Sequence, residues 1–314
     1  NHNSGKGKRS KKKHKKDRQH FGNKKKIKTL IFSACTHNRV EELNTLLSEP
    51  NADVNAKDIK SRTPLHIACE NNNENIIEIL LKVYANVNAR DYKSRTPLHY
   101  ACLKSNNENI IKILLQNDAK VNIKDENSIT PLHLACEVLG DNSKTIELLL
   151  QHHAEVNVKD ICLSTPLHWA HNEKVIKLLL EHNAKVNIKD DISKTPLHLA
   201  CGNSNNLKVV ELLLNHSDNS IDSLTLFDEA LKNTYCKDDI IKMLLFHRGE
   251  NGALLEKMGS SFQYISSYLH YHPSILHSTT HDHSTLLHLA LKSIDNNDDI
   301  FVSNYFDEDP DYYL

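Results

Sequence analysis

Histidine is the residue type with the widest chemical scope in this sequence, because its imidazole can bind a metal or exchange a proton near neutral pH. The 314 residues include 21 histidines. One set recurs at the same place in a repeated phrase, Thr-Pro-Leu-His-x-Ala or a close variant of it: His66, His99, His133, His168, His198 and His288. A second set gathers in one later stretch: His270, His272, His277, His281 and His283.

A shared metal is not favoured at the histidines of the repeated phrase. The five full copies begin at 63, 96, 130, 165 and 195, so consecutive histidines are one copy apart. Equivalent positions on packed helices lie roughly 8–10 Å apart, whereas ligands of one zinc ion must each lie about 2 Å from it. We predict that these histidines are structural and form a hydrogen bond near a helix start.

The denser group between 270 and 283 keeps a metal-binding protein open as an alternative. His281-Asp282-His283 is a short cluster of residues that can act as ligands. No spacing in this stretch fixes a coordination shell, however, and the phrase at Thr285 places the cluster in a polar turn. We therefore predict no metal site.

Catalytic chemistry receives little support from the remaining motifs. The chain has no G-x-S-x-G, no H-E-x-x-H, no glycine-rich phosphate loop and no Cys-x-x-Cys. Like residues spread at regular spacing are the opposite of an active site, which needs unlike residues within a few ångströms. We predict a non-enzymatic protein without catalytic residues or a cofactor. The regularly spaced acids are Asp58, Asp91, Asp125, Asp160 and Asp190.

Cysteine usage points away from disulfides. Cysteines that follow the alanine of the phrase should lie one copy apart, beyond the ~7 Å limit for a bridge, and are expected to act as small buried hydrophobic residues. Cys162 falls in a turn and is expected to be exposed. This usage is typical of a reducing, intracellular compartment. The residues after the alanine are Cys35, Cys69, Cys102, Cys136 and Cys201.

Three phrases recur in a fixed order and predict the elements that position these residues. Thr before Pro predicts a helix start, because the hydroxyl can cap a backbone N–H and proline is tolerated at the first helical position. A run such as Ile76-Ile77-Glu78-Ile79-Leu80-Leu81 predicts a second helix that is buried on most sides. A closing phrase such as 52–58, with alternating Val and Asn before charged residues, predicts a short extended segment and a turn.

This pattern resembles the ankyrin repeat family, whose mark is Thr-Pro-Leu-His-x-Ala at a period near 33. The resemblance covers residues 27–293 and implies an all-α solenoid of about nine helix-turn-helix units with protruding β-turn fingers. The units are expected to start near 29, 63, 96, 130, 165, 195, 225, 255 and 285.

The chain departs from the family in its use of glycine, of which it has only eight. Ser61, Ser94, Ser128, Ser193 and Leu163 stand where the turn glycine is expected. At the end of the second helix, Asn and Asp tolerate the left-handed conformation better than Tyr or His. The residues at this second place are Asn51, Tyr84, Asp118, His153 and Asn183.

The two ends of the chain carry opposite charge. Residues 1–26 are predicted to be a disordered basic arm, and residues 1–28 hold a net charge of +12. Residues 294–314 are predicted to form an acidic cap or tail. The run 11–16 resembles a nuclear import signal or nucleic-acid patch, so a nuclear regulator with nucleic-acid contacts through the arm is an alternative. No apolar run approaches the ~18 residues of a membrane span, and an intracellular location, cytoplasmic or nuclear, is expected.

The family resemblance implies a scaffold or adaptor that binds one or more proteins on an extended concave surface. A monomer is expected. Arg and Tyr are favoured interface anchors, so Arg62, Tyr92 and Arg95 lead among the candidate positions. The positions carried over by register are Ile59, Lys60, Arg62, Glu70, Asn71, Tyr92, Lys93, Arg95, Leu103, Lys104, Glu126, Asn127, Ile129, Glu137, Val138, Ile161, Cys162, Ser164, Asn172, Asp191, Ile192 and Lys194.

The resemblance also implies a modification. Ankyrin proteins are often substrates of the oxygen-sensing asparaginyl hydroxylase, which acts on the asparagine that follows valine in the closing phrase. A structural role for the same asparagines, as hydrogen-bonding turn residues, is expected in every unit. The asparagines at this place are Asn55, Asn88, Asn122, Asn157 and Asn187.

Overall fold

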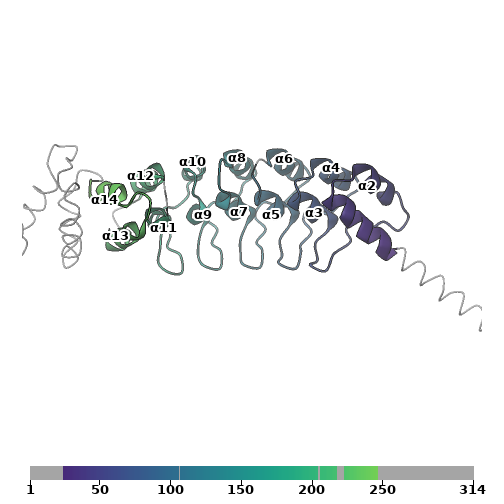
Figure 1. Ribbon diagram of the computed structural model, residues 1–314, viewed down its shortest axis with the longest axis horizontal. Helices are drawn as coiled ribbons and strands as arrows, with labels where there is room; N and C mark the ends of the chain where they lie inside the picture. The colour runs from purple at the N-terminus through teal and green to yellow at the C-terminus, as the bar shows by residue number, and fades with distance from the viewer. Residues whose placement is uncertain (1–23, 106, 204–205, 218–222, 247–314) are drawn as a thin grey trace, which may run out of the picture. The chain divides into compact units, whose positions relative to one another are not determined.

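The computed structural model describes residues 24–105, 107–203, 206–217 and 223–246, and within these ranges the chain is helical and contains no β-strand (Figure 1). The chain divides into two compact units, residues 1–185 and 186–314. Each unit is described by itself below. The predicted acidic tail, the histidines between 270 and 283, and the units expected at 255 and 285 lie outside the described residues.

The first unit alternates short and longer helices. Residues 24–36 are helical, so the first helix starts inside the segment expected to be the basic arm, whose first 23 residues lie outside the described part. In Figure 1 the first helices of successive repeats form one row, the second helices form another, and the connecting loops project from the first row. The helices are α2 (Val40–Leu47), α3 (Pro64–Glu70), α4 (Glu74–Lys82), α5 (Pro97–Cys102), α6 (Glu108–Gln116), α7 (Pro131–Glu137), α8 (Ser143–Gln151), α9 (Pro166–Trp169) and α10 (Glu173–Glu181).

The second unit continues the alternation, and α11 packs on α13 while α12 packs on α14. The sequence predicts a unit that starts near 225, and the helix pair α13–α14 lies there. The helices are α11 (Pro196–Asn203), α12 (Leu207–His216), α13 (Ser223–Lys232) and α14 (Lys237–Phe246).

The Thr-Pro phrase starts a helix in each of its five full copies, as predicted. At α3, the Thr63 backbone N–H and hydroxyl both lie within hydrogen-bond distance of His66 Nδ1, at 3.0 and 2.8 Å, and Pro64 takes the first helical position. The same Thr–His pair recurs at the start of α5, α7, α9 and α11. The local sequence therefore fixes where each first helix begins.

The hydrophobic core runs between the two rows of helices. In α4, Ile76, Ile77 and Leu80 are fully buried, and α6 buries Ile111 and Leu114 in the same way. The predicted second helix, buried on most sides, is thus confirmed. Apolar burial of this kind stabilises a fold by roughly 25 cal/mol per Å², so the aliphatic ladder is the main source of cohesion between repeats.

The cysteine predictions are also confirmed. The five cysteines that follow the phrase alanine are buried and unbridged, whereas Cys162 is exposed. Burial raises the pKa of Cys35 to about 12 and that of Cys201 to about 12. A thiol with so high a pKa is almost never a thiolate at neutral pH, so these cysteines are inert packing groups.

The connection between α7 and α8 is held against the next repeat. This connection, residues 138–142, contains Gly140, and α9 in the next repeat has only four residues. Asn172 Nδ2 donates to the Gly140 carbonyl oxygen at 3.0 Å, and Lys174 Nζ lies 2.6 Å from Asp141 Oδ2. The connection is therefore held against the start of α10, next to the short helix α9.

The residues that replace the expected turn glycine all adopt the left-handed conformation. Ser61, Ser94, Ser128 and Ser193 have φ between 58° and 63°, and Leu163 has φ 60°. At the end of the second helices, the same conformation is found at Tyr84, Asp118, His153 and Asn183. These predictions are confirmed because the tight turn requires a positive φ at this position, whichever residue occupies it.

Asn51 is the exception, and the prediction of a left-handed residue there was wrong. Helix α2 ends at Leu47, and its C-cap Ser48 keeps a right-handed helical conformation. The chain then turns through a hydrogen bond from Ala52 N to Glu49 O at 2.9 Å, with Pro50 inside the turn. The chain therefore leaves α2 through this turn, and Asn51 is not among the residues with positive φ.

Leu163 offers a direct test of this strain. Replacing Leu163 with glycine is expected to raise the free energy of unfolding by roughly 1 kcal/mol, because a left-handed residue with a Cβ carries about 1–2 kcal/mol of strain. The side chain is 44% exposed, so little buried surface is lost. Urea unfolding should show the gain. Ile161→Gly is the matched control: Ile161 lies in the same turn without a positive φ, and its replacement should lower stability. Equal losses at both positions would contradict the strain argument.

Candidate functional site

Five loops project from the starts of the first helices, and we call them fingers: residues 57–62, 90–95, 124–129, 159–164 and 189–194. Each finger is built around one aspartate. In the first, Asp58 Oδ1 accepts the backbone N–H groups of Lys60 and Arg62, both at 2.8 Å. The same arrangement recurs around Asp91, Asp125, Asp160 and Asp190. The repeated aspartates therefore shape turns and do not gather at one point.

Neighbouring fingers of the first unit are joined through their backbones. Tyr92 N donates to Lys60 O at 3.0 Å, Glu126 N to Lys93 O at 2.8 Å, and Ile161 N to Asn127 O at 3.0 Å. Backbone bonds of this kind restrict how far one finger can move against the next. The four fingers of the first unit thus form a continuous, preorganised row, and a partner that binds this row meets groups already in place.

The asparagine of the Val-Asn phrase joins repeats rather than closing its own turn. Asn88 Nδ2 donates to Asp118 O at 2.9 Å, and its Oδ1 accepts Lys120 N at 2.8 Å, both in the following repeat. Asn122 and Asn157 make the same pair of bonds to the repeats after them. The expected structural role is confirmed for these three asparagines, with the next repeat as the partner, whereas Asn187 Oδ1 is buried without a hydrogen-bond partner among the described residues.

The histidines of the repeated phrase also link successive repeats through hydrogen bonds. His66 Nε2 lies 3.0 Å from Arg95 O, and His99 Nε2 lies 3.2 Å from Ile129 O, in each case in the next finger. A carbonyl oxygen can only accept, so Nε2 carries the proton and Nδ1 accepts from the threonine. Burial lowers the pKa of His66 and brings that of His99 to about 4. The five phrase histidines in the described part of the chain are structural, as predicted, and His288 lies outside it.

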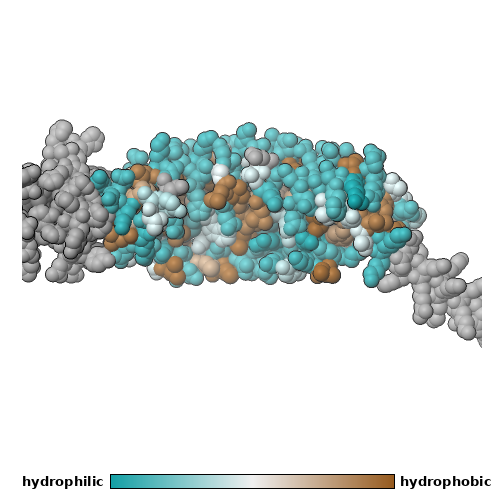
Figure 2. All heavy atoms as spheres, viewed as in Figure 1, coloured by the Kyte–Doolittle hydropathy of each residue, from teal (hydrophilic) through white to brown (hydrophobic). Residues whose placement is uncertain are grey.

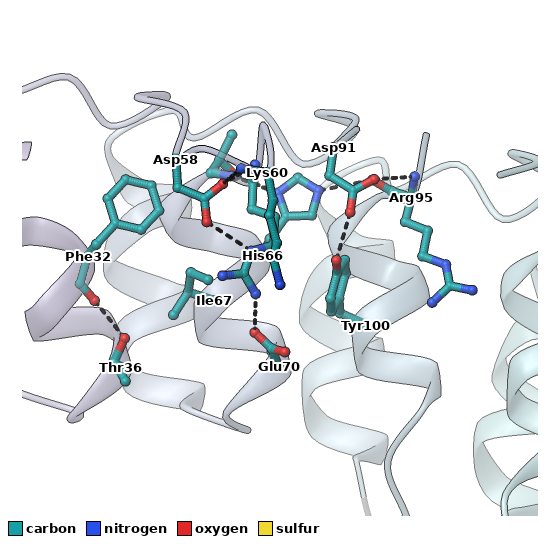
Figure 3. A network of polar contacts seen from close by, with 12 residues as sticks. Phe32, Thr36, Asp58, Lys60, His66, Ile67, Glu70, Asp91, Arg95 and Tyr100 are labelled. Carbon is teal, nitrogen blue, oxygen red and sulfur yellow. Dashed lines mark hydrogen bonds and ion pairs between the residues drawn. The ribbon is translucent and has the colours of Figure 1, made fainter. Parts of the chain in front are cut away.

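Arg62 and Arg95, which led the candidate anchors, are engaged within the chain. Arg62 Nε lies 2.9 Å from Asp58 Oδ2, and its Nη1 lies 2.7 Å from Glu70 Oε2. Arg95 Nε lies 3.0 Å from Asp125 Oδ2 in the next finger. Figure 3 shows Asp58 and Glu70, the two acids that contact Arg62, beside the hydrogen-bonded pair Asp91 and Tyr100 of the next repeat. Both arginines therefore position fingers, whatever else they contact.

Several other candidate positions present their side chains to solvent. Ile59 is 101% exposed, Tyr92 54%, Ile161 62% and Ile192 65%, all at the tips of fingers. In Figure 2, hydrophobic surface lies at the lower edge, where Figure 1 shows the projecting loops. Ile129 is only 8% exposed, so it packs inside its finger and offers the least surface of the set.

The remaining candidate positions divide by location. Leu103 is 36% exposed at the end of α5, and Asn172 caps α10 by accepting the Lys174 and Val175 N–H groups. Lys194 is ion-paired with Glu229 inside the second unit at 3.1 Å. The exposed polar or charged members are Lys60, Asn71, Lys104, Glu126, Glu137 and Asp191; Lys93, Asn127, Val138 and Ser164 are half-buried; Cys162 is exposed.

Sequence reasoning missed two aromatic residues on the first helices. Tyr100 O–H donates to Asp91 Oδ2 at 2.7 Å, and its ring stands edge-on to His66 at 5.5 Å between centroids. Trp169 stands in the same way against His133 at 5.7 Å. Both occupy the variable place of the phrase, between His and Ala, and that aromatic variation was the available signal.

Two other kinds of feature, a metal-binding cluster and a membrane-spanning helix, are absent from the described part of the chain. No group of three or more His, Cys, Asp or Glu side chains converges there to hold a metal ion. None of the helices among those residues is both long and apolar enough to cross a membrane. The row of fingers and the first helices behind it is therefore the candidate functional surface.

Comparisons with known proteins agree with this architecture. Residues 30–125 and 119–190 each match the family described as ankyrin repeats (3 copies), and residues 170–214 match ankyrin repeats (many copies). Together these segments cover more than half of the chain, which therefore belongs to the ankyrin repeat family. Ankyrin repeats generally mediate protein–protein interaction and are typically non-enzymatic. The count of nine units remains a prediction.

One curated protein shares a short segment with this chain. The human SMC5-SMC6 complex localization factor protein 1 is 48% identical to it over 48 residues. That segment is 15% of this chain but 4% of the human protein. The similarity is therefore confined to little more than one repeat of a much longer protein.

The asparagines that follow valine in the closing phrase remain proposed sites of hydroxylation. Asn88, Asn122 and Asn157 make the same two bonds, so their access to a hydroxylase should differ with the left-handed residue that precedes each of them. Tyr84 and His153 suit that conformation less well than Asp118 does. We expect Asn88 and Asn157 to gain one oxygen, about 16 Da, before Asn122 and Asn187, as measured by peptide mass spectrometry. Preferential reaction at Asn122 would contradict control by the preceding turn.

Proposed function

We propose that this chain is a non-enzymatic scaffold or adaptor that binds a partner protein across its fingers and first helices. The observation that carries the proposal is the combination of exposed apolar tips with a fixed backbone. Ile59 and Ile161 stand fully or largely in solvent, yet the fingers that bear them are held by aspartate turns and by bonds between fingers. Rigid, exposed apolar groups are what an interface uses as anchors.

The ladder arrangement favours binding over catalysis. Successive fingers repeat the same aspartate turn and successive helices repeat the same buried histidine, so like groups lie side by side along the row. An extended surface of this kind suits a partner of matching length. The human relative is named as a localization factor for a protein complex, which accords with a binding role. Its partner is not carried over, because the shared segment is so short.

Site-specific photo-crosslinking tests the proposal. A photoreactive residue introduced at Ile59 or Ile161 should crosslink to a protein captured from a cell extract. The same residue at Lys112 or Glu147, which are exposed on the second helices α6 and α8, should not. Stronger crosslinking from the second helices would move the site to the other face of the stack.

A substitution test gives the size of the effect. Ile59→Ser combined with Ile161→Ser should weaken binding of the captured partner at least about tenfold, because apolar anchors commonly contribute more than 1 kcal/mol each. Stability should change little, since both side chains are exposed. Lys112→Ser with Glu147→Ser is the matched control and should leave affinity unchanged. A titration that shows equal affinities for both double variants would contradict the tip anchors.

The two alternative functions suggested by the sequence, a nuclear regulator and a metal-binding protein, can each be tested separately. A nuclear regulator would bind nucleic acid through the arm, with affinity that falls steeply with salt and vanishes when residues 1–26 are deleted. A metal-binding protein would retain stoichiometric metal after purification, and the retention would be lost on replacing His281 and His283. Neither alternative requires the fingers, so neither outcome depends on the crosslinking result.

A further inference from the structure

The two fingers at 57–62 and 90–95 differ from the others in charge. Each carries three cations and one carboxylate, whereas the finger at 124–129 carries one cation and two carboxylates. Lys57, Lys60 and Arg90 are exposed and Lys93 is half-buried. None of these four forms an ion pair with another described residue, although Lys57 Nζ donates to Arg90 O at 3.3 Å. Positive charge is thus left over at these two fingers.

The carboxylates of these fingers are already fully used. Asp58 Oδ1 accepts hydrogen bonds from two backbone N–H groups, and Oδ2 accepts one from the Arg62 guanidinium at 2.9 Å. Asp91 Oδ1 accepts hydrogen bonds from the backbone N–H groups of Lys93 and Arg95, and Oδ2 accepts one from the Tyr100 hydroxyl. Neither acid can turn outward to neutralise a lysine without breaking its own finger. The positive surplus is therefore built into the turn.

An apolar group stands beside the cations on each finger. Ile59, between Lys57 and Lys60, is 101% exposed. Tyr92 is 54% exposed, and the Lys93 ammonium lies 5.7 Å from the centre of its ring. Such a surface matches a ligand that carries both carboxylates and an apolar side chain. It matches single-stranded nucleic acid less well, because Lys93 already occupies a face of the ring that a base would stack on.

Resting on the proposed scaffold function, we propose that the fingers at 57–62 and 90–95 dock an extended acidic peptide segment of the protein partner. Lys60 and Lys93 are equivalent positions, and packed repeats recur roughly every 8–10 Å. An extended chain covers that distance in about three residues. The preferred segment therefore has carboxylates about three residues apart with an aliphatic or aromatic residue between them. The exposed Glu126 on the next finger limits the site to these two fingers.

The test uses the full chain and a fluorescent synthetic peptide with two such Asp-Leu-x-Asp segments. Lys60→Glu with Lys93→Glu should weaken peptide binding at least about tenfold and lower its dependence on salt. The control is Lys112→Glu with Lys144→Glu, exposed lysines of α6 and α8 whose replacement changes the net charge equally. The control should bind within about twofold of the parent chain. Replacing the peptide's aspartates with asparagine should abolish binding.

Three results would overturn the proposal. Equal losses in both double variants would show that only net charge matters. Undiminished binding in Lys60→Glu with Lys93→Glu would place the peptide elsewhere, for instance on the basic segment 1–26. Tighter binding of a single-stranded oligonucleotide of the same charge, lost in the finger variant, would assign the fingers to nucleic acid. The first two results would leave the expected crosslinking of a partner from Ile59 and Ile161 unchanged. Failure of the acidic-peptide proposal is therefore distinguishable from failure of the scaffold function.

Discussion

Acidification from pH 7 to pH 5 is expected to remove about 2 kcal/mol of the free energy of unfolding through His99 alone. The pKa of His99 lies at about 4 in the folded chain against 6.5 for the ordinary group, with burial the largest cause. Each pKa unit corresponds to about 1.4 kcal/mol. Because the unfolded chain binds the proton first, stability is fully present above pH 6.5 and falls as the pH drops toward 4.

The geometry gives the reason for this sensitivity. His99 Nδ1 accepts the Thr96 backbone N–H at 3.1 Å, and Nε2 donates to Ile129 O at 3.2 Å. A second proton on the ring would have to sit on Nδ1, where the Thr96 backbone N–H can only donate and the Thr96 hydroxyl, 2.9 Å away, would have to turn from donor to acceptor. Burial lowers the pKa of His66 and of His133 as well, so the same conflict recurs along the stack and steepens the loss.

Urea unfolding between pH 7 and pH 5 measures the effect. His99→Gln is the informative variant, because glutamine can also accept at one end and donate at the other but does not titrate. It should reduce the slope of unfolding free energy against pH by up to about 1.4 kcal/mol per pH unit near pH 5.5, which corresponds to one proton. An unchanged slope would mean that His99 takes up its proton equally in both states, and would contradict the ladder argument.

The parts of the fold that the sequence predicted are those fixed within one repeat. Thr63, Pro64 and His66 lie within four residues, so their capping interaction follows from local chemistry. Ser94 and Leu163 take the left-handed conformation because a tight turn needs it, whichever residue occupies the place. Local rules failed at Asn51, where α2 ends early and the chain leaves the helix through a different turn.

The parts of the site that the sequence could not predict depend on the neighbouring repeat. Arg95 looked like a free anchor because its partner, Asp125, lies 30 residues away in the next finger. The Asn88 side chain seemed to belong to its own turn, yet both of its bonds reach the following repeat. The register placed Ile129 on the surface, but its side chain packs inward. The phase of the repeat follows from the sequence, whereas the contacts between repeats depend on how neighbouring repeats pack in three dimensions.

Leu132→Ala is expected to lower the free energy of unfolding by roughly 2–5 kcal/mol, the usual range for a buried leucine. Leu132 is 1% exposed on α7, and α7 packs against α5, α8 and α9. A cavity at this position therefore weakens three helix contacts, including those to the repeats on either side. In a stack held by nearest-neighbour contacts, such a loss is felt on both sides of the altered repeat.

Leu139→Ala supplies the matched control, because it removes the same atoms in the same repeat from a side chain that is 82% exposed. Its effect should stay within about 0.5 kcal/mol. Urea unfolding followed by circular dichroism gives both the midpoint and the m-value, which tracks the surface exposed on unfolding. If Leu132→Ala shifts the midpoint without changing m, the stack still unfolds as one cooperative body. A smaller m-value or a second transition would show that the stack unfolds in two separate parts, one on each side of the weakened repeat. Equal destabilisation by the two variants would contradict the core assignment, since only one of these leucines is shielded from water.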